Sequence, residues 1–195
     1  MTETVPITSA RRDELLERSY RYVLDHGLTG LSLRPLAEAI GSSPRVLLFL
    51  FGSKDGLVRA LLARARADEL EQLERVRHAP GTDILELALG VWEWLAALEH
   101  RGLLVLWTES YARDLAEPDG PWSGFARGTV QDWLGLLAAA QPPRVRGTRK
   151  GEAERTLVLA VLRGALLDLL ATGDERRATA AVRQGLGALR GDRER

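Results

Sequence analysis

The sequence predicts an all-α protein. Apolar residues recur at three- and four-residue steps along most of the chain, as at Leu15, Leu16, Tyr22 and Val23, which is the spacing of one helix face. No alternation of apolar and polar residues typical of a strand continues beyond a few residues. Glycine and proline clusters separate the periodic stretches, so we expect about nine helices joined by short breaks.

The first four predicted helices are bounded by serine and glycine. A serine hydroxyl can cap a helix N-terminus, proline is tolerated in the first turn, and glycine commonly follows a helix end. These preferences place caps at Ser32, Ser43 and Ser53 and helix ends at Gly27 and Gly41. The expected helices cover residues 9–26, 32–40, 44–50 and about 54–76.

The remaining sequence predicts a larger helical body. Five more periodic stretches are expected at residues 83–99, 101–115, 122–140, 152–172 and 174–189. Residues 142–151, PPRVRGTRKG, are basic and lack apolar periodicity, so we expect a mobile loop there.

The composition excludes several classes of protein. With 45% hydrophobic residues and 27 basic groups balancing 27 acidic ones, the chain is not of the disordered type. It has no cysteine, and its three histidines are scattered, so no metal site, cofactor or catalytic residue is predicted. No apolar run approaches the roughly 20 residues of a membrane span, and the polar N-terminus lacks the apolar core of a signal peptide. We therefore expect a cytoplasmic protein that does not enter the membrane.

One segment, Gly27–Leu57, carries a specific motif. Two short helices are joined by a tight turn at Gly41 and braced by a preceding helix, which is the layout of a helix-turn-helix. The segment resembles the DNA-binding domain of the TetR family of bacterial transcriptional regulators. The resemblance covers about residues 11–62 and rests on matching positions in order, namely Gly27, Ser32, Leu36-Ala37, Gly41, Phe51 and Lys54-Asp55-Gly56-Leu57.

The resemblance implies two domains, a three-helix DNA-binding domain in residues 1–60 and a helical effector-binding and dimerisation domain in residues 61–195. The predicted DNA-binding residues are Ser32, Arg34, Ser42, Ser43, Arg45, Val46, Phe49 and Lys54, of which Arg34 and Lys54 resemble the backbone contacts of the family. Two positions depart from the family. Leu48 and Leu50 stand where relatives commonly carry a tyrosine and a histidine or other polar residue, so phosphate contacts are expected to come from elsewhere.

The residues of the third helix allow more than one interpretation. A cation in the first turn, such as Arg45, is unfavourable by about 0.3–1 kcal/mol unless a phosphate or a guanine edge lies close by; otherwise it is a solvated arginine. Val46 either contacts a thymine methyl group or packs in the domain. Phe49 either packs inward or is covered by DNA, whereas Leu47 and Phe51 are expected in the core.

The last two predicted helices are expected to form a homodimer. Residues 157–170 are apolar nearly all round, and residues 174–189 are rich in small residues that allow close helix approach. Two such helices and their symmetry mates would form a four-helix interface. Arg163 and Asp168 interrupt the apolar run, and an ion pair or interface contact is favoured there over a ligand role.

All five tryptophans lie between residues 92 and 133. They either pack as ordinary core or line a cavity for an apolar or aromatic effector, with Glu109 or Arg163 orienting it. The residues that would line such a cavity or bind the effector are Trp92, Trp107, Tyr111, Trp133 and Arg163.

Together these features predict a dimeric transcriptional regulator that binds a partly palindromic DNA operator. By family default it is a repressor released by a small hydrophobic or aromatic effector. One alternative is a helix-turn-helix DNA-binding protein without an effector, and a remote one is an all-α enzyme. The chain has no Gly-rich phosphate loop and no paired-carboxylate motif that would favour the enzyme.

Overall fold

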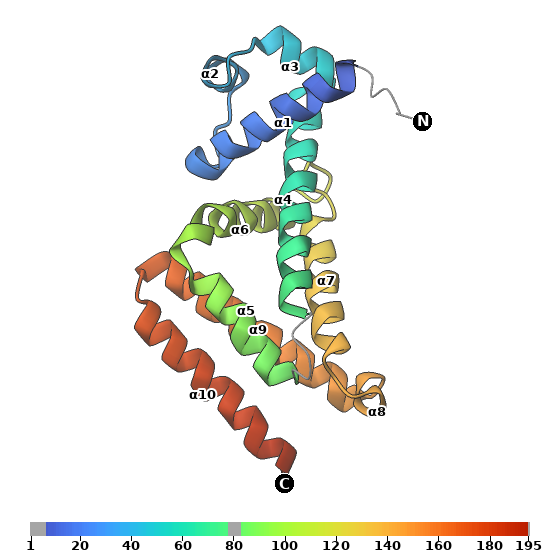
Figure 1. Cartoon of the computed structure of the whole chain (residues 1–195), viewed down its shortest axis with the longest axis vertical. Coiled ribbons are helices and arrows are strands. Elements are labelled where there is room, and N and C mark those ends of the chain that lie inside the picture. Colours follow the sequence, from blue (N-terminus) through green and yellow to red (C-terminus); the bar gives the residue numbers. More distant parts are fainter. Residues whose placement is uncertain (1–6, 78–82, 195) are drawn as a thin grey trace. The chain divides into compact units, whose positions relative to one another are not determined.

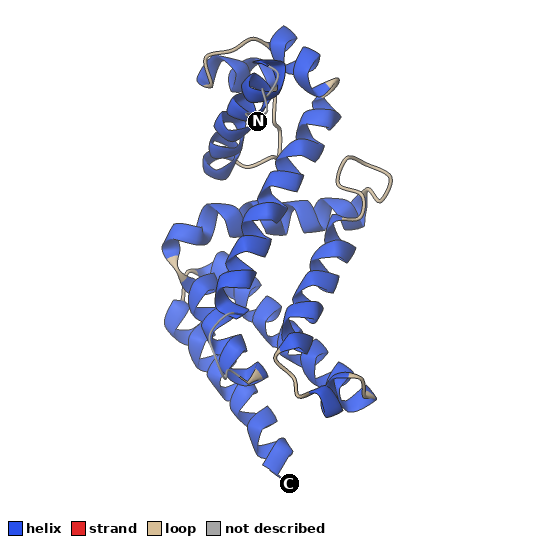
Figure 2. Cartoon of the chain, turned by 45° about the vertical axis from the view of Figure 1, so that its right-hand side comes forward, coloured by secondary structure: helices blue, strands red, loops and turns tan. Residues whose placement is uncertain are grey.

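The computed structural model describes residues 7–77 and 83–194, and all regular structure in these ranges is helical (Figures 1 and 2). The predicted all-α class is confirmed. The helices are α1 (Ile7–His26), α2 (Leu33–Ala39), α3 (Pro44–Phe51), α4 (Lys54–Arg77), α5 (Ile84–Ala96), the 3₁₀ turn η1 (Leu98–His100), α6 (Arg101–Ala116), α7 (Phe125–Ala139), α8 (Pro143–Arg146), α9 (Arg149–Thr172) and α10 (Glu175–Glu194).

The described residues form two compact units. The first contains the chain up to Asp68 together with Gly102–Ala126, and the second contains Glu69–Arg101 and the chain from Arg127 onward. Helix α6 therefore packs with the N-terminal helices although it lies far from them in the sequence. The division at residue 60 that the sequence suggests stays a prediction.

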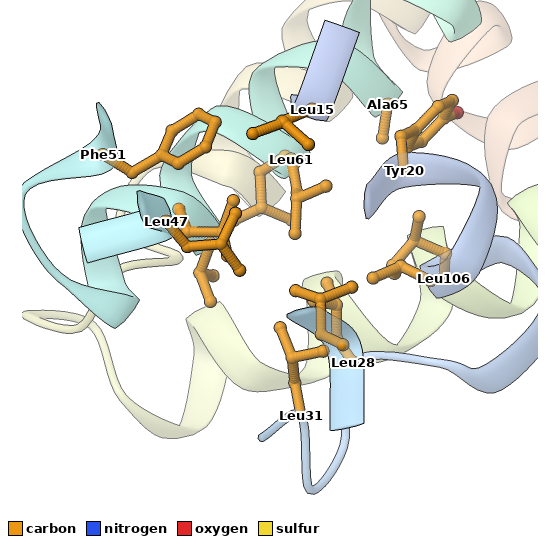
Figure 3. Packing of buried hydrophobic residues seen from close by; sticks show 14 of the residues in the cluster. Leu15, Tyr20, Leu28, Leu31, Leu47, Phe51, Leu61, Ala65 and Leu106 are labelled. Carbon is orange, nitrogen blue, oxygen red and sulfur yellow. The ribbon is translucent and has the colours of Figure 1, made fainter. Parts of the chain in front are cut away.

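The first unit is organised around one apolar core. Leu15 of α1, Leu47 of α3 and Leu61 of α4 are almost completely buried in it, and Leu106 reaches the same core from α6 (Figure 3). The expected inward positions of Leu47 and Phe51 are confirmed. Burial of these side chains fixes which face of the short helix α3 points outward.

The turn between α2 and α3 is closed by backbone hydrogen bonds. Ser42 N–H donates to the Ala37 carbonyl at 2.8 Å, and Gly41 has φ +67°, a left-handed conformation that glycine adopts at little cost. Ser43 caps α3 as predicted, because its hydroxyl accepts from Val46 N–H at 3.3 Å. Ser32 occupies the N-cap position of α2, but its hydroxyl makes no capping hydrogen bond, so that expectation is wrong.

A polar network joins α1 to α4 at the edge of this core. Tyr20 donates its phenol hydrogen to Asp68 at 2.8 Å, and Arg64 binds both Glu17 and Asp68. Burial, together with the bond to Asp68, raises the pKa of Tyr20 well above its usual value. The phenol therefore stays protonated and holds α1 on the middle of α4.

In the second unit, helices α5, α9 and α10 pack on one another. A capping box formed by Asp83 and Glu86 begins α5. Trp92 of α5 donates its indole hydrogen to Thr179 of α10 at 2.9 Å. Gly185 of α10 lies against Val161 of α9, where a Cβ would approach the valine methyl groups to 3.4 Å. A small residue at position 185 thus allows close approach of the last two helices.

The segment expected to be a mobile loop is ordered, and that prediction is wrong. Residues 143–146 form α8, and Thr148 caps α9 by accepting from Gly151 N–H at 3.0 Å. Arg146 donates to the carbonyls of Ala139 and Gln141 at 3.1 and 3.2 Å. These backbone contacts order the segment although it lacks the apolar periodicity by which helices are recognised in a sequence. Among the described residues, no helix is long and apolar enough to cross a membrane.

Candidate nucleic-acid interface

Helix α3 has one buried face and one outward face. Leu47 and Phe51 are buried, whereas Arg45, Val46 and Phe49 are exposed. Arg45 and Phe49 are one turn apart, so they lie together at the middle of the outward face. The sequence allows Phe49 either to pack inward or to be covered by DNA. In the structure 78% of its surface is exposed, so Phe49 does not pack inward.

Three basic residues lie on and beside this helix. Arg34 is in the first turn of α2, Arg45 in the first turn of α3 and Lys54 at the start of α4, and all three are exposed. Within the described ranges none of them has a carboxylate partner. By contrast, Arg11 and Arg18 of the same unit bind Glu14, and Arg64 binds Glu17 and Asp68. Three cations without such partners are available to an anionic ligand.

The predicted serine positions differ in accessibility. Ser32 and Ser43 are exposed, and the Ser43 hydroxyl can still donate to a phosphate while it accepts from Val46 N–H. Ser42 is half-buried, and its hydroxyl oxygen is enclosed without a hydrogen bond to any residue that the structure describes. In this conformation Ser42 presents no hydroxyl to DNA.

The two leucines that depart from the family pattern have different positions. Leu48 is exposed at the flank of the outward face of α3. Leu50 is half-buried and packs against the core of the first unit. A polar side chain at position 50 would therefore lose apolar packing, which gives a structural reason for leucine there.

Two residues that the sequence does not place here support the helix-turn-helix. Arg18 of α1 donates to the Ile40 carbonyl at 3.2 Å, at the end of α2. The Glu109 carboxylate of α6 accepts from Leu28 N–H at 2.9 Å and from the Thr29 hydroxyl, in the segment between α1 and α2. The sequence suggests Glu109 as a group that orients an effector, whereas in the structure it fixes this segment. Its separation of 80 residues from Thr29 hides the contact from local sequence patterns.

Comparison with known proteins agrees with this geometry. No family model matches the sequence. Three curated HTH-type transcriptional regulators, from Mycobacterium bovis and two strains of Mycobacterium tuberculosis, are each 30% identical in an alignment of 97 positions that covers 47% of this chain. The chain spans less than half the length of these relatives, 42%.

Solved structures match nearly the whole chain. A TetR-family regulator from Cytophaga hutchinsonii has a TM-score of 0.74 at 14% identity, covering 95% of this chain and 98% of that one. A further TetR-family protein, from Rhodococcus sp., has a TM-score of 0.71 at 19% identity, covering 92% and 98%. The chain has the fold of the TetR family. The resemblance inferred from Gly27–Leu57 is confirmed.

A third solved structure similar to this chain is that of the multidrug-binding protein EbrR in complex with imidazole. It has a TM-score of 0.64 at 26% identity, covering 93% of this chain and 94% of EbrR. EbrR was also solved with proflavin, with 27% identity. The relatives and neighbours named here are regulators and a binding protein, in agreement with the predicted DNA-binding transcriptional regulator.

The predicted ligand-binding residues divide between the two units. Trp107 and Tyr111 of α6 belong to the first unit, where their half-buried rings lie 5.3 Å apart and pack against its core. Trp92 and Trp133 are buried in the second unit. The Trp92 indole N–H donates a hydrogen bond to Thr179, and the Trp133 indole N–H donates one to Glu69 at 2.5 Å. Arg163 of the second unit is half-buried on α9. Trp92 and Trp133 thus have the contacts of core residues.

The second unit contains a surface pocket of about 350 Å³ between α5, η1 and α10. Trp92 is the one predicted ligand-binding residue among those that line it; the others include Leu89, Glu93, Leu98, Glu175 and Arg183. Its volume is within the range of small-molecule sites.

Proposed function

We propose that this TetR-fold chain is a dimeric transcriptional regulator that binds a partly palindromic DNA operator in the cytoplasm. The observation that carries the proposal is the outward face of α3, where exposed Arg45 is flanked by Arg34 and Lys54, three cations without a carboxylate partner among the described residues. In a helix-turn-helix the second short helix enters the major groove, and the surrounding cations contact phosphates.

The contacts expected of each side chain follow from its position. Arg45, at the middle of the outward face, is placed to donate to the O6 and N7 atoms of a guanine. Arg34, Lys54, Ser32 and Ser43 lie at helix starts around α3 and are suited to phosphate oxygens. Such phosphate contacts fix the register of the protein on the duplex without selecting a sequence.

The exposed surface of the last two helices supports a homodimer. Five exposed residues of α9 alternate at three- and four-residue spacing, namely Leu157, Ala160, Gly164, Leu167 and Ala171. This spacing forms a narrow apolar seam of the kind that packs against another helix. Small residues are also exposed on α10 at Ala181, Gly187 and Ala188. A homodimer formed through this surface would carry two copies of α3, one for each half-site.

As a repressor, the protein would be released from its operator DNA by a small effector. The solved complexes of EbrR with imidazole and with proflavin favour a small aromatic molecule for this chain too. Among the described residues, the half-buried pair Trp107 and Tyr111 and the 350 Å³ pocket beside Trp92 are two places where such a molecule would find aromatic surface. A DNA-binding protein without an effector is the second candidate, favoured by the core-like contacts of Trp92 and Trp133.

Selection of bound duplexes from a random DNA library tests the proposal. The wild-type protein should enrich one partly palindromic sequence with half-sites about 34–36 Å apart or a multiple of this distance. A variant with Arg34, Arg45 and Lys54 all changed to alanine should enrich none, whereas Arg113→Ala, which removes a half-buried arginine of α6 paired with Glu117, should behave as wild type. Enrichment by the triple variant equal to wild type would refute the proposed interface.

A further inference from the structure

The outward face of α3 is unusually apolar for a surface surrounded by cations. Val46, Leu48 and Phe49 are 37%, 42% and 78% exposed, on a helix of only eight residues. A single exposed apolar side chain is ordinary, but a contiguous group rimmed by charged residues indicates a binding surface. Phe49 is at the centre of this group, and Val46 and Leu48 flank it on either side.

We propose that Phe49, assisted by Val46, is a specificity-determining residue that contacts thymine methyl groups in the major groove. This inference rests on the proposed function of α3 and adds the chemistry by which the helix selects a sequence. The 5-methyl group of thymine is the one apolar group that a base pair displays in the major groove, and phenylalanine is among the side chains that contact it. Burying Phe49 against a methyl group removes both from water.

The charges around the apolar group favour DNA as the occupant. Arg45 lies one turn before Phe49 on the same face, and Arg34 and Lys54 belong to the adjoining helices. Glu38 and Asp55 are the acidic residues of the segment from α2 to the start of α4, so its net charge is positive. A protein partner that covered Phe49 would have to be acidic around an apolar centre, whereas duplex DNA offers phosphates around the groove and methyl groups within it.

The spacing on α3 also predicts the arrangement of the bases. Arg45 and Phe49 are four residues apart, which is about 6 Å along a helix axis. Successive bases of one strand are about 3.4 Å apart. A guanine bound by Arg45 and a thymine contacted by Phe49 should therefore lie within about two base pairs of each other in each half-site.

Replacing thymine by uracil tests this contact, because uracil lacks only the 5-methyl group. The duplex enriched from a random library by the wild-type protein is resynthesised with single deoxyuridine replacements, and the Kd of each is measured. We expect one or two positions per half-site, close to a guanine, at which removal of one methyl group weakens wild-type binding about fourfold. Phe49→Ala should bind the thymine and uracil duplexes equally. Leu115→Ala, which removes another exposed leucine of the first unit, should keep the difference.

The outcomes separate this inference from the proposed function. If the wild type enriches no duplex, the function itself is refuted and the inference with it. If it enriches a duplex that requires Arg45 but no uracil replacement changes its Kd, DNA binding stands and the methyl contact is refuted. An effect of uracil that persists in Phe49→Ala and in Val46→Ala would overturn the assignment to these residues. Phe49→Ala should unfold at the wild-type temperature, because the side chain is exposed.

Discussion

Glu109 of α6 accepts a hydrogen bond from the backbone N–H of Leu28 at 2.9 Å, and its other carboxylate oxygen binds the Thr29 hydroxyl. One side chain thereby holds the segment that leads from α1 into the helix-turn-helix. Gly102, in the first turn of the same helix, lies so close to the Leu24 carbonyl that a Cβ there would approach this oxygen to 2.7 Å. Helix α6 is thus fixed at two points against the helices that present α3.

Replacing Glu109 by alanine should destabilise the first unit by about 1–3 kcal/mol, because the partly buried Leu28 N–H is left without its acceptor. Glu109→Gln retains an acceptor oxygen and should cost less. Glu117→Ala, which removes an exposed carboxylate just beyond the C-terminal end of α6 that is paired with Arg113, should cost at most about 1 kcal/mol. Urea unfolding measures all three, and equal destabilisation by Glu109→Ala and Glu117→Ala would contradict the structural role of Glu109.

The two N-cap serines of the helix-turn-helix should respond differently to alanine. Ser43→Ala removes the hydroxyl that accepts from Val46 N–H and should cost about 1 kcal/mol of stability. Ser32→Ala removes no capping bond and should change stability by less than about 0.5 kcal/mol, while weakening DNA binding because its hydroxyl no longer reaches a phosphate. Thermal unfolding without DNA and binding titrations measure the two effects separately. Destabilisation as large for Ser32→Ala as for Ser43→Ala would contradict this account.

Arg45 and Lys54 should differ in the kind of binding they support. Arg45→Ala should weaken binding to the selected duplex by about 1–3 kcal/mol and relax the preference at one base pair per half-site. Lys54→Ala should weaken all duplexes alike and reduce the slope of log K against log salt by about one for each phosphate that is no longer neutralised. Titrations at several salt concentrations on matched and mismatched duplexes distinguish them. If Arg45→Ala keeps the sequence preference of the wild type, Arg45 does not recognise a guanine.

The exposed seam of α9 should be required for dimerisation. Leu167→Glu places a charge where the two copies would meet, so it should give a monomer in sedimentation at micromolar concentration, against twice 21.5 kDa for the wild type. The monomer should also bind the operator only weakly, because both half-sites are engaged jointly. Leu115→Glu, which changes an exposed leucine of the first unit, is the matched control and should stay dimeric. Buried Leu166 and Leu169 are unsuitable positions, because they pack inside their own protomer.

Local sequence patterns predict most of the fold. Helix periodicity locates α1 to α7 and α9 to α10 to within a few residues, and the Ser43 cap and the Gly41 turn are predictable from local chemistry. The helical structure of residues 143–151 is not predictable from the sequence, because it depends on hydrogen bonds of Arg146 and Thr148 with backbone groups. The sequence likewise does not show that Ser32, which occupies the N-cap position of α2, makes no capping hydrogen bond.

The candidate site is predictable in its residues but not in their surroundings. The exposure of Phe49 and the enclosure of the Ser42 hydroxyl depend on how α3 packs over the core of the first unit. The role of Glu109 depends on a contact across 80 residues. The tryptophans illustrate the same limit, since Trp92 and Trp133 have helical spacing that suits either a cavity or a core, and only their bonds to Thr179 and Glu69 distinguish the two.

An effector that binds beside Trp107 should release DNA through α6. Trp107 and Tyr111 are on the same helix as Glu109, which holds Leu28, so a ligand that moves α6 also moves the segment before α2. Such a ligand weakens DNA binding only if it prefers the conformation that does not fit the operator. Proflavin, a ligand of the neighbour EbrR, is the probe.

In the absence of DNA, proflavin should quench the tryptophan fluorescence of the wild-type protein in a saturable way. The same concentrations of proflavin should weaken operator binding. Trp107→Phe should reduce both effects, whereas Trp94→Phe, whose indole stacks on His100 at 4.3 Å in the second unit, should reduce neither. Glu109→Gln should keep the quenching but show weaker release, because the hydrogen bonds that couple α6 to Leu28 are weakened. If the quenching is abolished in Trp94→Phe and kept in Trp107→Phe, the ligand binds in the second unit. If proflavin weakens operator binding by Glu109→Gln as much as by the wild type, α6 does not couple the ligand to DNA binding.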